Sequence, residues 1–154
     1  MTRGTSMLVH ATALAVSGRG VLIFGASGAG KSDLALRLIT TPLVYDGKPV
    51  ETRLIADDQV LIERIGDRLF ASPPATIAGK LEVRGLGILP FPFVPRAEVD
   101  LAVVLGAAAE IDRLPEPRQV YPLLGLDLAL VRVEGSAPSA PSKLVLAAMT
   151  LPKK

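Results

Sequence analysis

Residues 25–32 carry the strongest chemical signal in the sequence, because they read Gly-Ala-Ser-Gly-Ala-Gly-Lys-Ser. They fit the pattern G-x-x-x-x-G-K-S/T, in which glycines let successive backbone N–H groups converge on phosphate oxygens. Lys31 is then placed to reach the terminal phosphates of a nucleotide, and the Ser32 hydroxyl to bind Mg²⁺. The pattern predicts that the whole loop binds nucleotide phosphates, with contributions from Gly25, Ala26, Ser27, Gly28, Ala29, Gly30, Lys31 and Ser32.

Two adjacent aspartates, Asp57 and Asp58, end a later apolar run that begins at Leu54. In proteins with such a loop, an acidic residue at a strand end orients the metal or the attacking group. Successive side chains of a strand point to opposite faces, so the two carboxylates cannot face the phosphate in the same way. We expect one to act on the nucleophile and the other on the metal or a partner side chain. Without the upstream loop, the pair would indicate only a solvated turn.

Two further residues carry weaker signals. His10 is the single histidine of the chain, and a lone histidine is more often a packed or surface residue than a catalytic one. Glu82 lies in the segment Leu-Glu-Val-Arg-Gly-Leu-Gly-Ile at 81–88, which by itself indicates only an edge strand and a turn. Residue type and spacing alone assign no role to either side chain.

The elements that must position these residues are short, because thirteen prolines and fourteen glycines divide the chain. Helical periodicity after the loop predicts a helix over 31–40, with Asp33 and Arg37 one turn apart outside its apolar face, and Pro42 limits its length. A second helix is predicted over 142–151. The predicted strands cover 7–16, 21–24, 54–56, 60–65, 69–72, 99–105 and 128–133, with a hairpin turn at 65–68 and the run 99–105 buried on both faces.

Composition excludes several classes of protein. With 49% apolar and 21% charged residues, the chain can bury a proper core, and we expect a single domain over 1–154. A formal net charge of +2 without a basic cluster argues against a nucleic-acid partner. The absence of cysteine excludes disulfides and thiolate metal sites. The apolar stretch 101–109 is too short to span a bilayer, so we expect a cytoplasmic protein with no membrane partner.

Taken together, three segments resemble the catalytic domain of the HPr kinase/phosphorylase family. That family combines a loop of type G-x-S-G-x-G-K-S, a strand close to R-L-I/V-A-D-D, and a signature close to L-E-I/V-R-G-L-G-I. The same order occurs here at 25–32, 53–58 and 81–88. A family histidine before the loop, followed by a G-x-G turn, is matched by His10 with Gly18 and Gly20. The resemblance extends over about residues 7–148.

This resemblance implies an enzyme that uses ATP and Mg²⁺ to phosphorylate a serine of HPr, the phosphocarrier of the sugar phosphotransferase system. It implies that Lys31 holds the transferred phosphate and that Ser32 and Glu82 bind Mg²⁺. The pair Asp57–Asp58 would supply the base that takes the serine proton, with Asp58 preferred and His10 beside the pair. Arg113 would stabilise phosphoryl charge.

The implied fold is α/β, a P-loop NTPase-like (phosphoenolpyruvate carboxykinase-like) core with a mixed sheet and additional antiparallel strands. Family members also catalyse phosphorolysis of phosphoserine-HPr and form hexamers, so we expect a homo-oligomer. Three features depart from the family. The usual N-terminal domain is missing, which indicates a short form, and the insert 42–52 is longer than usual. The late loop 138–144 has Lys143 where the family has arginine, so the expectation of a kinase is firmer than that of a phosphorylase.

Two other classes of function remain open. A P-loop kinase for a small molecule, or a plain NTPase, would share the loop and the aspartates but has no need of the segment 81–88. Such a kinase usually has a lid with several arginines, and the candidates here, Arg113 and Arg118, are few. A nucleotide-sensing module without turnover is the third class, and the intact aspartates argue against it, since a sensor needs no base.

Overall fold

The computed structural model describes residues 5–117 and 119–152. Over these residues the chain forms two α-helices, α1 (Lys31–Thr40) and α2 (Ala140–Met149), and two 3-10 turns at Ala75–Ile77 and Ala108–Glu110. The remaining elements are strands: β1 (Thr5–His10), β2 (Thr12–Val16), β3 (Arg19–Phe24), β4 (Leu43–Tyr45), β5 (Lys48–Val50), β6 (Thr52–Ala56), β7 (Gln59–Ile65), β8 (Arg68–Ser72), β9 (Lys80–Val83), β10 (Gly87–Pro90), β11 (Ala97–Leu105), β12 (Val120–Leu123) and β13 (Leu126–Val133). No described helix is long and apolar enough to cross a membrane.

The main sheet orders its strands β1-β7-β8-β11-β3-β2-β6, and β13 with β12 branches from β11. Its centre consists of β3, β11 and β13, which run parallel to one another. β2 is antiparallel to both β3 and β6, so β6 runs in the same direction as β3. The connection from β3 through α1 to β6 is therefore a β-α-β crossover that skips β2. Because β3 and β6 run in the same direction, the residues that follow β3 and those that follow β6 lie at the same end of the sheet, where the carboxyl ends of these strands are.

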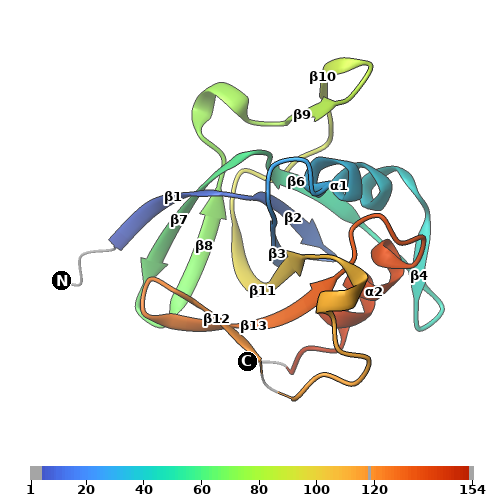
Figure 1. Ribbon diagram of the computed structural model, residues 1–154. Helices are drawn as coiled ribbons and strands as arrows, with labels where there is room; N and C mark the ends of the chain where they lie inside the picture. Colours follow the sequence, from blue (N-terminus) through green and yellow to red (C-terminus); the bar gives the residue numbers. More distant parts are fainter. Residues whose placement is uncertain (1–4, 118, 153–154) are drawn as a thin grey trace.

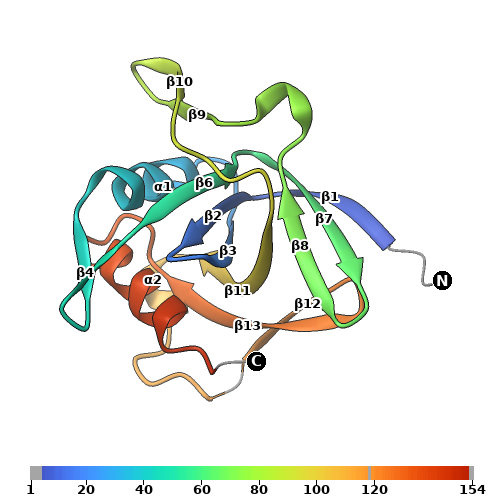
Figure 2. The same ribbon diagram turned by 180° about the vertical axis from the view of Figure 1, so that it is seen from behind.

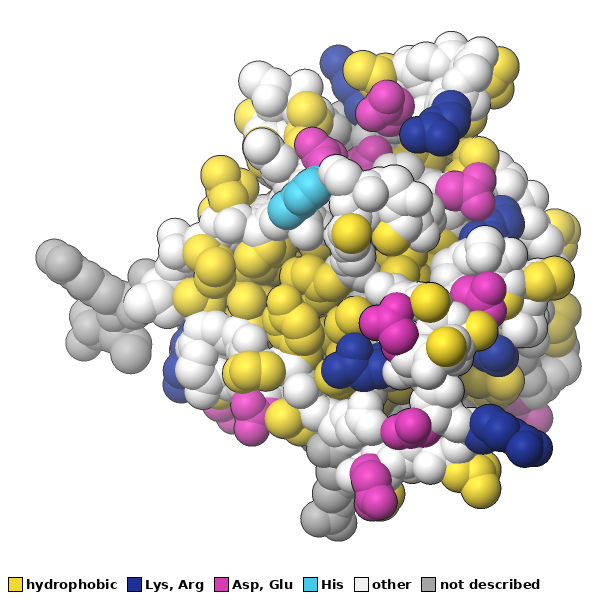
Figure 3. All heavy atoms as spheres, viewed as in Figure 1, with side chains coloured by type: hydrophobic (Ala, Val, Ile, Leu, Met, Phe, Trp, Pro, Cys, Tyr) yellow, Lys and Arg dark blue, Asp and Glu magenta, His cyan; other side chains and the backbone are white. Residues whose placement is uncertain are grey.

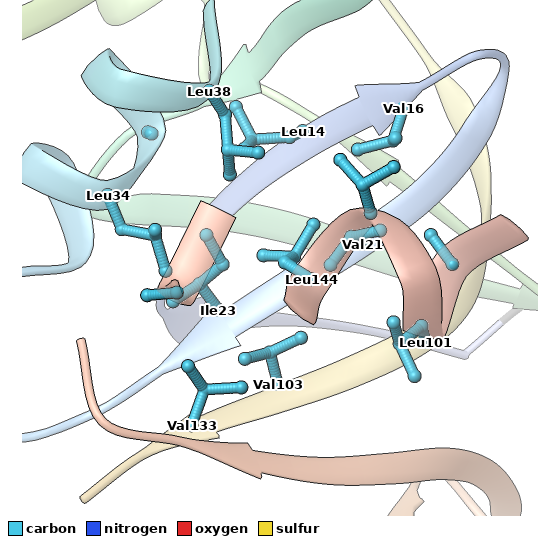
Figure 4. Close-up of a cluster of buried hydrophobic side chains, with 14 of the residues drawn as sticks. Leu14, Val16, Val21, Ile23, Leu34, Leu38, Leu101, Val103, Val133 and Leu144 are labelled. Atoms are coloured by element: carbon cyan, nitrogen blue, oxygen red, sulfur yellow. The ribbon is translucent and has the colours of Figure 1, made fainter. Parts of the chain in front are cut away.

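Both helices lie on the same face of the sheet (Figures 1 and 2). Their apolar sides pack on alternate residues of the central strands, since only every second side chain of a strand points to that face. Figure 4 shows this cluster, which combines Leu14, Val16, Val21, Ile23, Leu101, Val103 and Val133 of the sheet with Leu34, Leu38 and Leu144 of the helices. The packing fixes α1, and thereby the loop before it, against the sheet.

The opposite face is largely covered by the curl of the sheet itself, with partly buried hydrophobic side chains at its margin. The intervening residues of the central strands, such as Leu22 and Ala102, pack against Ile62 of β7, Leu69 of β8 and Leu123 of β12. Hydrophobic side chains line a hollow in the middle of the view in Figure 3. The central strand β11 thus has apolar neighbours on both faces, as predicted for the run 99–105, although Asp100 interrupts its apolar sequence.

One predicted element differs clearly from the structure. The sequence predicts one buried strand over 7–16, but the structure has two strands that meet at Ala11. β2 is wholly buried between β3 and β6, whereas β1 pairs with β7 alone among the described strands, at the edge of the sheet, and is largely exposed. At Ala11 the chain leaves its pairing with β7 and begins to pair with β3 and β6. Hydrophobic composition does not reveal such a change of partner strand, so it predicted one continuous strand. His10, the last residue of β1, is exposed at this junction.

The other sequence-based boundaries are close to those observed. The helix predicted over 31–40 is α1, and the i, i+4 pair Asp33–Arg37 joins Oδ2 and Nε at 3.1 Å. The hairpin turn at 65–68 connects β7 with β8. The second helix begins at Ala140 rather than Ser142, because Pro141 is compatible with the first turn of a helix. Lys143 therefore lies on α2 and not in a loop.

Two hairpins lie outside the main sheet. The insert 42–52 forms the hairpin β4–β5. The hairpin β9–β10 projects at the top of Figure 1 and is fixed by Leu81 and Val83, which are buried against the α1 side of the sheet. A side chain at Gly79, just before it, would meet the ring of Phe93 at 2.6 Å, so this approach requires glycine. The hairpin brings Glu82 to the carboxyl end of β6, where Asp57 and Asp58 lie.

Candidate active site

The loop 25–30 adopts the conformation that its glycines predicted. Gly28 and Gly30 have φ values of 82° and 96°, which side chains rarely tolerate, and Gly30 is the N-cap of α1. Lys31 is buried, and its Nζ donates hydrogen bonds to the carbonyl oxygens of Gly25 at 2.8 Å and Ala26 at 3.2 Å. Its ammonium group therefore lies against the loop. With the positive end of α1, it forms a cradle for phosphate oxygens.

Asp57 lies directly after β6, and its buried carboxylate accepts three hydrogen bonds. The hydroxyl groups of Ser32 and Thr12 donate to Oδ1 at 2.7 Å and 2.9 Å. The backbone N–H of Glu82 donates to Oδ2 at 3.3 Å. Four segments distant in sequence thus meet at one carboxylate. Both hydroxyl protons point at Oδ1, because an ionised carboxylate only accepts hydrogen bonds.

Asp58 faces the opposite direction. Its Oδ1 lies 2.7 Å from Nε2 of His10, and the two side chains are 71% and 56% exposed. Asp58 has a φ of 69°, and the N–H of Gln59 donates to the carbonyl oxygen of Asp57 at 2.8 Å, so the three residues form a γ-turn. The turn sends the two carboxylates apart. In the described part of the chain, Oδ2 of Asp58 accepts no hydrogen bond.

The sequence-based site residues fall into three groups. The loop residues 25–32, Asp57, Asp58 and His10 come together in one region, as expected. Glu82 reaches this region through its backbone N–H, while its carboxylate is exposed and makes no hydrogen bond within the described residues. Arg113 lies in the exposed segment between β11 and β12, and no described contact joins it to the other candidates. Its role stays a prediction, and Arg118 lies outside the described residues.

Sequence reasoning missed Thr12. It follows His10 by two residues, and the run 7–16 is apolar apart from these two, so the only signal of Thr12 was a hydroxyl at a position predicted to be buried. The described residues contain three buried polar side chains, Thr12, Lys31 and Asp57, and all three belong to this region. Burying a polar side chain is costly unless it is hydrogen-bonded, as these three are. Their gathering in one region is typical of a functional site.

The donor set fits a magnesium ion that arrives with a nucleotide. No cluster of three His, Cys, Asp or Glu side chains that could hold a metal occurs in the described residues. Mg²⁺ needs no such cage, since it prefers oxygen ligands and is usually held by one or two protein groups together with substrate phosphates and water. The Ser32 hydroxyl and the Asp57 carboxylate supply oxygens of this kind beside the phosphate cradle.

Comparison with known proteins agrees with this geometry. The family model of the HPr serine kinase C-terminal domain matches residues 3–150. The chain belongs to this family. The resemblance drawn from the three sequence segments is therefore confirmed.

Relatives of this HPr kinase C-terminal domain include two named HPr kinase/phosphorylase. That of Clostridium tetani is 37% identical over 120 residues, which cover 77% of this chain and 36% of the relative. That of Cupriavidus metallidurans is 34% identical over 151 residues, covering 92% and 44%. The chain therefore spans less than half the length of these two relatives.

A solved structure supports the fold. The HPr(Ser) kinase/phosphatase of Coxiella burnetii matches with a TM-score of 0.75 at 24% identity, covering 91% of this chain and 87% of that one. This likeness confirms the predicted α/β fold with a mixed sheet and additional antiparallel strands.

Proposed function

We propose that this domain transfers the terminal phosphoryl group of ATP to a serine hydroxyl of the phosphocarrier protein HPr. Membership of the family and the names of its relatives support this substrate. The observation that carries the proposal is that two neighbouring carboxylates face opposite directions. Asp57 is turned to the phosphate loop, and Asp58 is turned to the open surface. One faces the donor, and the other faces an acceptor arriving from solvent.

On the donor side, the residues of the chain bind and orient. The N–H groups of the loop and the ammonium of Lys31 hold the phosphates, exchanging the present bonds to Gly25 and Ala26 for phosphate oxygens. Asp57 keeps the proton of Ser32 directed at itself, which leaves the oxygen lone pairs of Ser32 pointing away from Asp57. Ser32 and Asp57 would hold Mg²⁺ beside these phosphates, where the ion would supply neutralisation of their charge.

On the acceptor side, Asp58 acts as the base. The serine oxygen of the partner forms a bond to the terminal phosphorus, the bond from that phosphorus to the bridging oxygen of ADP breaks, and the serine proton moves to Oδ2 of Asp58. His10 holds Oδ1 at 2.7 Å and fixes the direction of the free oxygen. The exposure of this pair suits an acceptor hydroxyl that is presented by another protein, since no pocket has to enclose it.

Several finer features belong to the same proposal. Residues 1–154 act as a single, cytoplasmic catalytic domain that regulates the phosphotransferase system, uses Mg²⁺ and assembles as a homo-oligomer. Glu82 joins Ser32 as a metal ligand, and Arg113 stabilises phosphoryl charge. The reverse reaction, in which inorganic phosphate attacks phosphoserine and yields pyrophosphate, uses Asp58 as the acid.

The decisive experiment measures transfer from labelled ATP and Mg²⁺ to purified HPr and to HPr whose target serine is replaced by alanine. We expect label on the first protein and none on the second. The variant Lys31→Ala should abolish labelling, because it removes the charge that holds the terminal phosphates. Adding inorganic phosphate to the labelled product then tests the reverse reaction.

A charge-matched control is available in Asp67, which is exposed in the turn between β7 and β8. Asp67→Asn removes the same charge as Asp58→Asn and should leave labelling unchanged. ATP binding without label on either form of HPr would contradict the proposal and favour a small-molecule kinase or a sensor.

A further inference from the structure

Thr12 occupies an unusual place for a hydroxyl group. It is the first residue of β2, whose side chains are all buried, and Thr12 itself is 0% exposed. A valine would fill the same space and suit a central strand at least as well. A hydroxyl at such a position is unfavourable unless it is hydrogen-bonded. The partner is Oδ1 of Asp57, 2.9 Å away, which also accepts the hydroxyl of Ser32.

The three side chains form a chain of contacts that starts in the core and ends at the phosphate loop. Thr12 is held by β2, which pairs with β3 on one side and β6 on the other. Its hydroxyl restrains Oδ1 of Asp57, and the N–H of Glu82 restrains Oδ2. The orientation of the carboxylate therefore depends on both contacts. That orientation in turn determines where the Ser32 proton points.

We propose that Thr12 is a positioning residue for the metal-binding hydroxyl of Ser32, acting through Asp57. By fixing Oδ1, the Thr12 hydroxyl keeps the Ser32 proton on Asp57 and leaves the lone pairs of Ser32 available to a metal ion. This inference rests on the proposed function, because it concerns the same nucleotide site. It adds a residue that touches neither metal nor nucleotide.

The test measures binding, not turnover. Calorimetric titration with a non-hydrolysable ATP analogue, with and without Mg²⁺, gives the factor by which Mg²⁺ tightens binding. We expect Thr12→Val to reduce this factor roughly tenfold or more, as does the loss of partners that orient metal ligands in other proteins. Binding without Mg²⁺ should be unchanged, and Thr12→Ser, which restores a hydroxyl, should recover the factor.

A matched control is Thr52→Val on the neighbouring strand β6. The Thr52 Oγ1 is buried, with no hydrogen-bond partner among the described residues, so the same substitution removes a hydroxyl that positions nothing. It should leave the Mg²⁺ factor unchanged. In an Asp57→Asn background, Thr12→Val should lower the factor no further, since both act through one carboxylate.

The possible outcomes separate the inference from the proposed function. An unchanged Mg²⁺ factor in Thr12→Val would overturn the inference. So would equal weakening with and without Mg²⁺, or failure of Thr12→Ser to recover the factor, because each indicates a packing role. If Thr12→Val does not fold, Thr12→Ala replaces it in the same titration. A wild-type chain that binds no ATP analogue would instead overturn the proposed function, and the inference with it.

Discussion

Asp57 and Asp58 are consecutive in the chain, but they belong to two regions of opposite character. Asp57 lies in a buried cluster where every oxygen is hydrogen-bonded to a fixed group of the domain. Asp58 lies at the surface, where His10 is its one hydrogen-bond partner within the described residues. Well-packed polar networks hold geometry, whereas an exposed carboxylate can exchange its partner for a substrate. One strand end thus presents a buried, hydrogen-bonded carboxylate and an exposed carboxylate that we propose as the base, and the γ-turn at Asp58 separates the two.

The largest expected effect concerns the exposed side. Asp58→Asn should reduce phosphoryl transfer to HPr by about a thousandfold, since a positioned base contributes roughly 10²–10⁴ in rate. Binding of the ATP analogue should stay within twofold of wild type, because Asp58 does not contact the phosphate loop. Rapid-quench transfer assays and calorimetry measure the two quantities. Transfer at the wild-type rate would show that Asp58 is not the base, and the two aspartates would then not differ in catalytic role.

The buried side should show its effect in stability. Asp57→Asn turns an acceptor into a donor toward either the Glu82 N–H or the two hydroxyls, so we expect the free energy of unfolding to fall by about 2 kcal/mol. Asp58→Asn, at an exposed position, should change it by no more than about 0.5 kcal/mol. Urea denaturation followed by circular dichroism measures both. Equal stabilities of the two variants would show that burial does not distinguish these carboxylates.

A smaller effect is expected at the partner of the exposed carboxylate. His10→Ala should lower kcat for transfer about tenfold through misorientation of Asp58, with KM for ATP unchanged. His10→Gln, which retains a hydrogen-bond donor, should recover part of the loss. A change in KM for ATP alone would place His10 on the donor side, contrary to the geometry.

The smallest expected effect tests the turn that separates the two regions. Asp58→Gly removes the side chain that is held at positive φ, and relief of such a conformation is worth about 1 kcal/mol. The free energy of unfolding should therefore rise while transfer is lost, as in Asp58→Asn. A fall in stability would indicate that the His10–Asp58 contact outweighs the backbone strain.

Much of the fold could be predicted from the sequence because its signals are local. The glycine pattern and the periodicity after it specified the phosphate loop and α1, and Pro42 and the turn at 65–68 marked real boundaries. The run 7–16 failed as a prediction, since its division at Ala11 depends on which strands pair with each half. Hydrophobic composition indicates that a segment is buried, but it does not indicate which strand pairs with that segment.

For the site, the sequence by itself determined the residue types and their order: a phosphate loop, two aspartates, and a resemblance that pointed to His10. The tertiary structure alone decided how they divide. Asp57 meets Thr12 across 45 positions of sequence, and Asp58 meets His10 across 48. Such contacts depend on strand register and on a positive φ at one aspartate, neither of which is encoded by a local pattern. The residue types of the site can therefore be predicted from the sequence, whereas the direction in which each carboxylate points depends on the long-range pairing of strands.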